Sequence, residues 1–287
     1  MVRQRRHLTT PLFLSNNYRN LTTPSSHDPA RHSYLNHCRR IIDAVDSQSA
    51  AIATAADWFS KSILANRMVH LFGSGHSRIM VEEMWPRYGS FPGFNPIVEL
   101  SLSFHNLVVG ANGQRQAMFL ENVSGLAARI LRNFVLSPDD TALIISSSGC
   151  NVVPVEMAEV FRANRVKVVA IVSKAHADAS TSRHPNGVKL TDAADLILDT
   201  GAPVGDAMVS IPGLDTPVAP GSTVGGCLLV NAIKAETAAR LTAAGQPPLV
   251  LTASALTGPE RATTLFEAAY DEHSRRLAAL YAPAGLP

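Results

Sequence analysis

Short apolar runs alternate with helical segments along most of this sequence, and this alternation constrains the fold more than any other feature. Runs typical of buried strands occupy residues 67–72, 97–100, 141–145, 166–172 and 196–198. Between them, apolar residues recur at helical spacing over 79–85, 119–136 and 153–162. Strands that alternate with helices predict right-handed crossovers and a parallel sheet covered on both faces. The sequence therefore predicts an α/β protein with a three-layer, doubly wound fold.

Further helical patterns flank this region. Residues 34–66 predict one long helix or two in tandem, and residues 223–243 and 259–281 predict two more. The segment 201–221 is rich in proline and glycine, so we expect a functional loop without regular structure there. Residues 1–33 contain no acidic residue before Asp28 and predict a disordered tail, with an organellar transit peptide as the alternative. We therefore expect a tail over 1–33 and one domain over 34–287.

Composition excludes several classes of protein. The chain has 287 residues and a formal net charge of +2, and much of its positive excess lies in the first forty residues. The folded body is therefore close to neutral, which argues against nucleic acid as the main partner. The sequence has no run of eighteen apolar residues and no secretory h-region, and its three cysteines lack metal or redox spacing. These features predict a cytoplasmic protein with no structural disulfide, no membrane partner and no bound metal.

A glycine-rich turn follows the first predicted strand. It contains Gly73, Ser74, Gly75, His76 and Ser77. Two glycines let the backbone approach an anion, and free N–H groups at a helix start bind negative charge. A tight turn with an N-cap serine and no ligand is the alternative. A dinucleotide fingerprint would need a third glycine where Arg78 stands, although Glu99 lies at a suitable distance for one.

A second polar loop follows the predicted strand 141–145. It offers the hydroxyls of Ser146, Ser147 and Ser148 and the amide of Asn151, immediately before a predicted helix. Phosphate oxygens accept several hydrogen bonds at once, which this group supplies from side chains and backbone. A polyserine turn on the surface is the alternative. Because open α/β sheets bind ligands at the carboxyl ends of their strands, we expect the two loops to bind one phosphate ester.

Together these motifs resemble the SIS-domain (sugar isomerase) family of phosphosugar isomerases and binding proteins. Gly73-Ser-Gly-His-Ser77 is similar to the first loop of that family, and Ser146-Ser-Ser-Gly-Cys-Asn151 to its phosphate loop. Pro220-Gly-Ser-Thr223 resembles its third signature, which adds Ser222 and Thr223 as phosphate-binding candidates. The resemblance is closer still to a bacterial branch, the UPF0309 group, in the patterns Gly75-His-Ser, Glu82-Glu-Met, Asn95-Pro-Ile, Thr181-Ser-Arg-His-Pro-Asn-Gly187, Gly205-Asp-Ala and Asn231-Ala-Ile.

This resemblance implies a central five-stranded parallel sheet flanked by helices. It also implies a homodimer or higher homo-oligomer, with the phosphosugar site at the subunit interface and no cofactor. The chain has no helix-turn-helix module, so it departs from the SIS-containing transcriptional regulators.

Catalytic groups are harder to assign. Isomerisation of a sugar phosphate needs a base and an acid. Glu83, with Glu82 as its alternative, lies near the place where related isomerases carry a catalytic glutamate, and we expect a closed pocket to raise its pKa. His184 and His105 are candidates for the acid, beside His76, and Asp206 and Glu236 are second-rank acids. An ion pair on the helix surface or a solvated imidazole is the alternative for each of these groups.

Arg183, beside His184, is placed to pair with a phosphate or to be solvated at the surface. The leading hypothesis is a phosphosugar isomerase or related lyase acting on an aldose or amino-sugar phosphate. A sugar-phosphate sensor without catalysis is the second hypothesis, and a nicotinamide-dependent dehydrogenase is the third.

Overall fold

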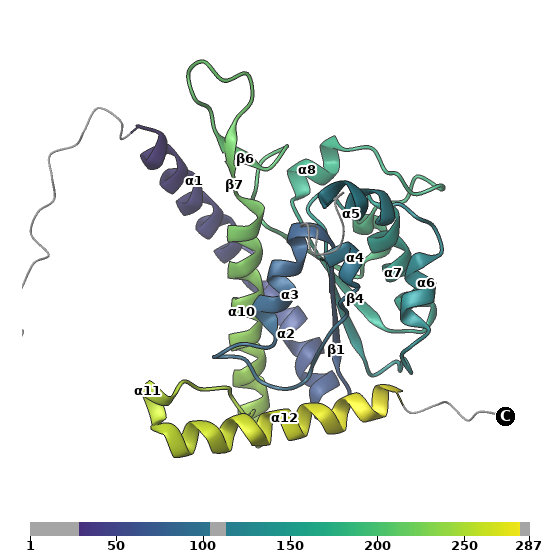
Figure 1. The fold of residues 1–287 in the computed structure, drawn as a ribbon, viewed down its shortest axis with the longest axis vertical. Helices are drawn as coiled ribbons and strands as arrows, with labels where there is room; N and C mark the ends of the chain where they lie inside the picture. Colours follow the sequence, from purple (N-terminus) through teal and green to yellow (C-terminus); the bar gives the residue numbers. More distant parts are fainter. Residues whose placement is uncertain (1–28, 104–112, 282–287) are drawn as a thin grey trace, which may run out of the picture.

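A five-stranded parallel sheet forms the centre of the computed structural model, which describes residues 29–103 and 113–281 (Figure 1). The sheet order is β2-β1-β3-β4-β5, and every neighbouring pair is parallel. The strands are β1 (Val69–Gly73), β2 (Phe94–Pro96), β3 (Thr141–Ile145), β4 (Lys167–Val172) and β5 (Leu196–Asp199). The predicted doubly wound α/β fold is confirmed.

Helices cover both faces because side chains alternate along each strand. Leu71, Leu143 and Ile171 pack on one face against α2 (Ser49–Leu64), α3 (Arg78–Met84) and α10 (Ser222–Ala243). Their neighbours Phe72, Ile144 and Ala170 pack on the other face against α6 (Leu126–Leu131), α7 (Val152–Ala163) and α9 (Leu190–Ala193). Both layers exclude water, so the strands are the continuous apolar runs that the sequence shows.

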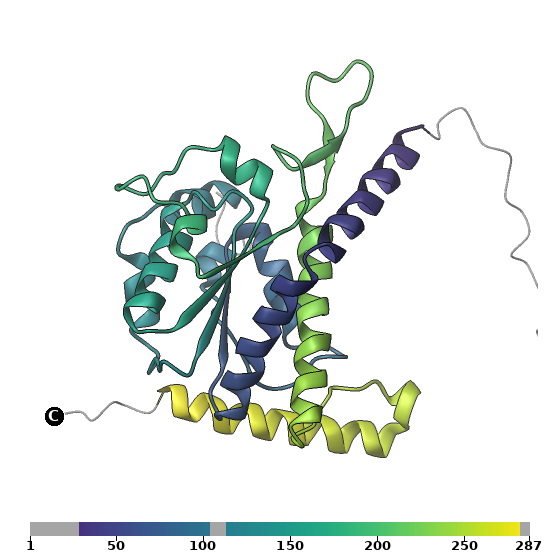
Figure 2. The ribbon, with the colours of Figure 1, turned by 180° about the vertical axis from the view of Figure 1, so that it is seen from behind.

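Two long helices and a hairpin extend this core. The predicted helical region 34–66 consists of two tandem helices, α1 (Pro29–Asp46) and α2. Figure 2 shows α1 running alongside the start of α10, next to a projecting two-stranded hairpin of β6 (Ala207–Val209) and β7 (Val218–Pro220). The expectation of irregular structure throughout 201–221 is therefore wrong, because Ala207 and Val209 pair with Pro220 and Val218.

Two further expectations are corrected. The strand expected over 97–100 lies earlier, at β2, because Gly93 at φ 122° leads directly into Phe94, whose side chain is fully buried. Leu100 instead begins α4 (Leu100–Ser103). The single helix expected over 119–136 is divided into α5 (Gln114–Leu120) and α6, because Gly125 adopts a left-handed conformation at φ 84°.

Arg276 of the last helix, α12 (Pro259–Tyr281), fastens it across the amino ends of the strands (Figure 1). The guanidinium of Arg276 donates to the carbonyl oxygens of Ile63 at 3.0 Å and Arg67 at 3.1 Å.

The remaining helical elements are η1 (Gly75–Ser77), α8 (Lys174–Ala179) and α11 (Ser254–Thr257). Because α1 begins at Pro29, residues 29–33 of the predicted tail are helical, and residues 1–28 lie outside the described residues. None of the described helices is long and apolar enough to cross a membrane.

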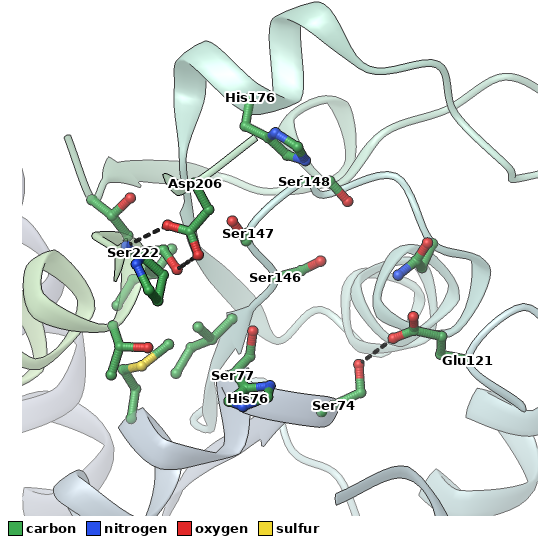
Figure 3. Close-up of a pocket in the computed structure, with 18 of the residues that line it drawn as sticks. Ser74, His76, Ser77, Glu121, Ser146, Ser147, Ser148, His176, Asp206 and Ser222 are labelled. Carbon is green, nitrogen blue, oxygen red and sulfur yellow. Dashed lines mark hydrogen bonds between the residues drawn. The ribbon is translucent and has the colours of Figure 1, made fainter. Parts of the chain in front are cut away.

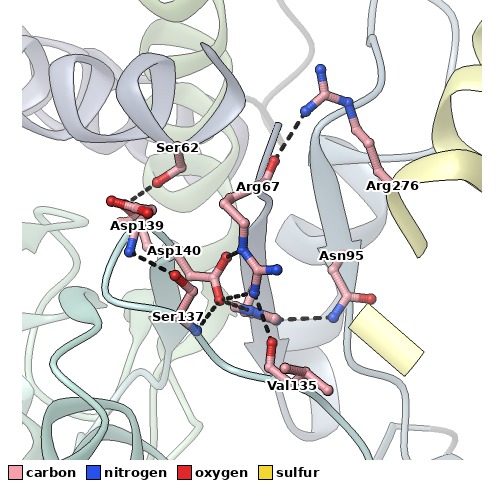
Figure 4. A network of polar contacts seen from close by, with 10 residues as sticks. Ser62, Arg67, Asn95, Val135, Ser137, Asp139, Asp140 and Arg276 are labelled. Atoms are coloured by element: carbon pink, nitrogen blue, oxygen red, sulfur yellow. Dashed lines mark hydrogen bonds and ion pairs between the residues drawn. The ribbon is translucent and has the colours of Figure 1, made fainter. Parts of the chain in front are cut away.

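A polar network joins the same amino ends from within (Figure 4). Nε and Nη2 of Arg67 donate to the two carboxylate oxygens of Asp140, each at 2.8 Å. His70, on β1, places Nε2 3.4 Å from Asp140, which is long for a hydrogen bond, and accepts at Nδ1 from Asn95 at 3.0 Å. Burial alone would raise the pKa of Asp140, but the contact with His70 and the hydrogen bonds from Arg67 outweigh burial and lower that pKa. The buried carboxylate is therefore held ionised.

Candidate functional site

A hollow of about 500 Å³, the serine pocket, lies at the carboxyl ends of β1, β3 and β4 (Figure 3). All three predicted signatures contribute to its wall. The contributing residues are Ser74, Gly75, His76, Ser77, Ser146, Ser147, Ser148, Asn151, Ser222 and Thr223. The expected meeting of the glycine turn and the serine loop is thus what the fold produces, and of the predicted phosphate-binding residues only Gly73 is not in the wall.

Gly73 instead makes the turn possible. A Cβ atom at Gly73 would lie 2.6 Å from the carbonyl oxygen of Ser77, so a side chain here would collide with the backbone. The amide of Ser77 donates to the carbonyl of Ser74 at 3.1 Å, which closes the turn. Gly75 supplies a positive φ of 55°. This tight reversal brings Ser74 and Ser77 to the end of the sheet.

The serine loop presents hydroxyl donors. The hydroxyl oxygen of Ser146 accepts from the amide of Gly149 at 3.2 Å, and that of Ser148 accepts from the amide of Cys150 at 3.3 Å. These bonds use oxygen lone pairs and leave the hydroxyl protons unassigned. Within the described residues, none of the hydroxyls of Ser146, Ser147 and Ser148 donates to a protein acceptor. The loop therefore offers the pocket donors, which is what a phosphate ester requires.

The polar groups of the third signature already bind a side chain of the protein, Asp206. The carboxylate of Asp206 accepts from the amide of Ser222 at 2.6 Å, from its hydroxyl at 2.8 Å and from the amide of Gly221 at 3.1 Å (Figure 3). An anion at the amino end of α10 is favourable, and here the protein provides it. Ser222 is thus engaged by Asp206, whereas we had expected it to bind phosphate directly.

Glu121 is the carboxylate that sequence analysis missed. It directly follows α5 and lines the serine pocket, where the hydroxyl of Ser74 donates to its Oε2 at 2.8 Å (Figure 3). Burial raises the pKa of Glu121, and the hydrogen bonds from Ser74 and Asn151 and the charge of Arg183 only partly oppose this. The Ser124-Gly125 pair is a turn signal that could have ended the expected helix near Glu121.

Glu83 lies elsewhere. Its carboxylate accepts from Arg87 and, at 2.8 Å, from Nδ2 of Asn231, and it lines a separate hollow beside Tyr88 and Phe266. Burial alone would raise the pKa of Glu83, but the hydrogen bonds from Asn231 and Arg87 outweigh it and lower that pKa. The expected rise in the pKa of Glu83 is therefore wrong.

Some of the histidines line the serine pocket and others do not. His184 is buried and lies 3.5 Å from Glu159, outside the wall of the serine pocket, and His105 lies outside the described residues. His76 lines the pocket, and so does His176, which the sequence did not single out. Nδ1 of His176 accepts from the amide of Gly205 at 2.7 Å, so the neutral ring carries its proton on Nε2 as a donor. The described residues include no cluster of three His, Cys, Asp or Glu side chains suited to a metal ion.

This sheet, with a glycine turn and a serine loop at its carboxyl edge, has the architecture of a SIS-domain protein, and the SIS domain profile matches residues 33–173. A UPF0309 protein of Halalkalibacterium halodurans is 34% identical over 232 residues, which cover 79% of this chain and 93% of that protein. A UPF0309 protein of Streptomyces griseus is 32% identical over 206 residues, covering 71% and 80%. The chain belongs to the UPF0309 family of SIS-domain proteins.

A solved structure is also similar to this chain. A phosphoheptose isomerase from Francisella tularensis superimposes with a TM-score of 0.47 at 14% sequence identity, covering 75% of this chain and 98% of that one.

Proposed function

We propose that the serine pocket binds a sugar phosphate and that the protein is a phosphosugar isomerase or a related lyase. One observation carries this proposal: a single pocket holds a row of hydroxyl donors and a partly buried carboxylate, Glu121. A SIS domain supports a role in phosphosugar isomerisation or binding. The argument from the residues has two parts, the anchoring of the phosphate and the transfer of a proton.

Hydroxyl and backbone donors anchor the phosphate. No lysine or arginine is among the described residues that line the serine pocket. The phosphate therefore relies on the hydroxyls of Ser77, Ser146, Ser147 and Ser148 and on nearby backbone amides. A hydrogen bond to a charged group contributes about 1.5–3 kcal/mol, so several together hold the phosphate without a cation.

Glu121 moves the proton. Isomerisation of an aldose to a ketose removes a proton from the carbon next to the carbonyl and returns it to the neighbouring carbon, and a lyase begins with the same removal. Because burial raises the pKa of Glu121, its carboxylate is a stronger base at neutral pH than an exposed glutamate. The hydroxyl of Ser74, which belongs to the phosphate-binding turn, fixes one carboxylate oxygen at 2.8 Å. Base and phosphate site are thereby held in one geometry.

Exchange of a substrate proton with solvent tests this function. Hexose, heptose and N-acetylamino sugar phosphates are incubated with the protein in D₂O and followed by NMR. We expect deuterium at the reacting carbon with at least one of them. Glu121→Gln keeps the shape of the side chain and removes its basicity, so it should abolish exchange while leaving phosphate affinity nearly intact.

Glu83→Gln is the matched control, since Glu83 lies in a separate hollow. If Glu83→Gln abolishes exchange and Glu121→Gln does not, the base is the glutamate that the sequence favoured. If the wild type binds a sugar phosphate without exchange, the protein is a sensor.

Light scattering at micromolar concentration tests the predicted homodimer, which a mass near 30.6 kDa would contradict. The cytoplasmic location also stays a prediction.

A further inference from the structure

A second hollow adjoins the serine pocket and shares part of its wall. This hollow, the arginine hollow, has a volume of about 410 Å³ and is lined by Arg183, Cys150, Ser180, Thr181, Ser148 and His176, among others. Ser148 and His176 line both spaces. In Figure 3 these two side chains lie close together, across the pocket from Ser74 and His76. A ligand whose phosphate contacts the serine loop can therefore extend past Ser148 and His176 into the arginine hollow.

The arginine hollow is lined by hydrogen-bond donors and by one cationic side chain, Arg183. One guanidinium nitrogen of Arg183 donates to Oδ1 of Asn151, and a guanidinium carries five N–H donors in all. Within the described residues the guanidinium has no other hydrogen-bond partner. Ser180 and Thr181 add hydroxyls, and His176 adds the Nε2 proton fixed by its bond from Gly205. No acidic residue is among the described residues that line this hollow.

The charges that act on the thiol of Cys150 are mainly positive. Burial raises its pKa, but Lys189 and Arg183 both act to lower it, and only Asp192 adds to the rise through its charge. Two cations against one anion leave the surroundings of the hollow positive. A planar carboxylate or a phosphoryl group fits an arginine with free N–H donors, because two parallel hydrogen bonds then form.

We propose that the natural substrate is a sugar phosphate that carries a second anionic group, a carboxylate or a second phosphoryl group, and that Arg183 binds this group in the arginine hollow. The inference rests on the proposed function, because it takes the serine pocket as the site of the first phosphate. It also connects the hollow to catalysis. Arg183 donates to Asn151, and Asn151 is hydrogen-bonded to Glu121. An anion on Arg183 offsets the positive charge that lowers the pKa of Glu121, so the second group strengthens the base.

Two matched pairs of ligands test the proposal by calorimetry. Glucitol 6-phosphate and 6-phosphogluconate differ in a carboxylate, and fructose 6-phosphate and fructose 1,6-bisphosphate differ in a second phosphoryl group. We expect the doubly anionic member of at least one pair to bind about tenfold more tightly than its partner. The pair that shows the gain identifies the second group.

Arg183→Gln should remove that gain, so that the two members of the pair bind with similar affinity. Arg183→Lys should keep part of it, because lysine retains the charge but not the paired donors. Arg165→Gln is the control, since Arg165 is exposed and lines neither space. Equal affinities within both pairs would overturn the proposal, as would an equal loss for both members of a pair in Arg183→Gln.

Failure of this inference differs from failure of the proposed function. If singly anionic ligands bind and Ser146→Ala with Ser148→Ala weakens them, the serine pocket holds phosphate, whatever the second group does. If all four ligands bind equally in wild type and in the double serine variant, the phosphate assignment itself is wrong. If none of the four binds, both proposals are rejected for these ligands.

Discussion

The two ends of the parallel sheet both carry polar side chains but use them differently. At the amino end, the carboxylate of Asp140 accepts two hydrogen bonds from Arg67, as Figure 4 shows, and lies 3.4 Å from Nε2 of His70. At the carboxyl end, the hydroxyls of Ser146 and Ser148 accept bonds from the backbone but donate to no described protein group. The amino end therefore pairs its buried charges with each other, with only Nε2 of His70 left at a long contact, and the carboxyl end has donors ready for a ligand.

This difference separates stability from function along the same strands. Buried polar groups whose partners are all present hold neighbouring strands in place, while leaving one without its partner is costly. Donors that point into an open pocket are solvated until a ligand arrives, so they add little to folding and much to binding. Substitutions at the amino end should therefore affect unfolding, and those at the carboxyl end should affect affinity.

The largest effect is expected at the amino end. Asp140→Asn removes the negative charge that faces Arg67 and His70, and should lower the free energy of unfolding by about 3 kcal/mol. Urea denaturation measures this change, and Asp139→Asn, at the exposed neighbouring position, is the control. Affinity for a sugar phosphate should be unchanged in the folded protein. A tenfold loss of affinity in Asp140→Asn would show that the two ends are not independent.

The serine loop should show the opposite pattern. Ser148→Ala should weaken sugar-phosphate binding by about 1–3 kcal/mol, and the double variant with Ser146→Ala should weaken it further. The free energy of unfolding should change less than it does in Asp140→Asn. Calorimetry gives the affinities, with Ser137→Ala at the amino end as the control. Unchanged affinity in the double variant would remove the phosphate assignment.

A smaller effect is expected in the glycine turn. Gly75 has a φ of 55° and no atom within 4 Å of the place where a Cβ would lie, so Gly75→Ala adds backbone strain without a collision. We expect a loss of about 1–2 kcal/mol in the free energy of unfolding, and less for Gly75→Asn. Gly187 has a φ of 72° and similar open space, so Gly187→Ala should destabilise equally. Only the Gly75 variant should also weaken phosphate binding.

The smallest effect is a pair of opposite pH dependences. The folded pKa of Asp140 is lowered, so its contribution to stability is present above its unfolded pKa and is lost as the pH falls through the folded value. The folded pKa of Glu121 is raised, so its contribution is full below its unfolded pKa and is lost as the pH rises through the folded value. The stability of Glu121→Gln relative to wild type should therefore be greater at neutral pH than at pH 4. Denaturation at several pH values measures both slopes, and slopes of the same sign would contradict the comparison.

The sequence predicted β1, β3 and β4 well because these strands lie in the middle of the sheet and are buried on both faces, which makes them near-continuous apolar runs. Strand β2 was missed because its three residues stand among prolines and glycines, and only their pairing with Val69, His70 and Leu71 of β1 makes them a strand. The hairpin of β6 and β7 escaped notice for the same reason. Pairing between distant residues is not visible in local composition.

The site was predicted where it depends on strand ends and missed where it depends on helix orientation. The two loops could be placed together because the carboxyl ends of parallel strands meet at one edge. Helix α3 is short and apolar on more than one side, so its pattern does not tell which face meets the pocket. In the fold Met80 lines the serine pocket, whereas Ile79 and Glu83 line another hollow. Glu121 reaches the pocket because the chain turns after α5, which periodicity alone did not reveal.

The helix that crosses the amino ends of the strands, α12, is synthesised long after the sheet that it contacts, and this matters for folding on the ribosome. Arg276 binds the carbonyl oxygens of Ile63 and Arg67, which lie more than two hundred positions earlier in the chain. A ribosome releases residues from the amino terminus onward, so the central strands emerge long before α12. Until then the edge that α12 covers is open to other apolar surfaces. The sheet of the nascent chain therefore depends on a helix that is made much later, and a truncation that removes α12 should be more damaging during synthesis than its exposed position suggests.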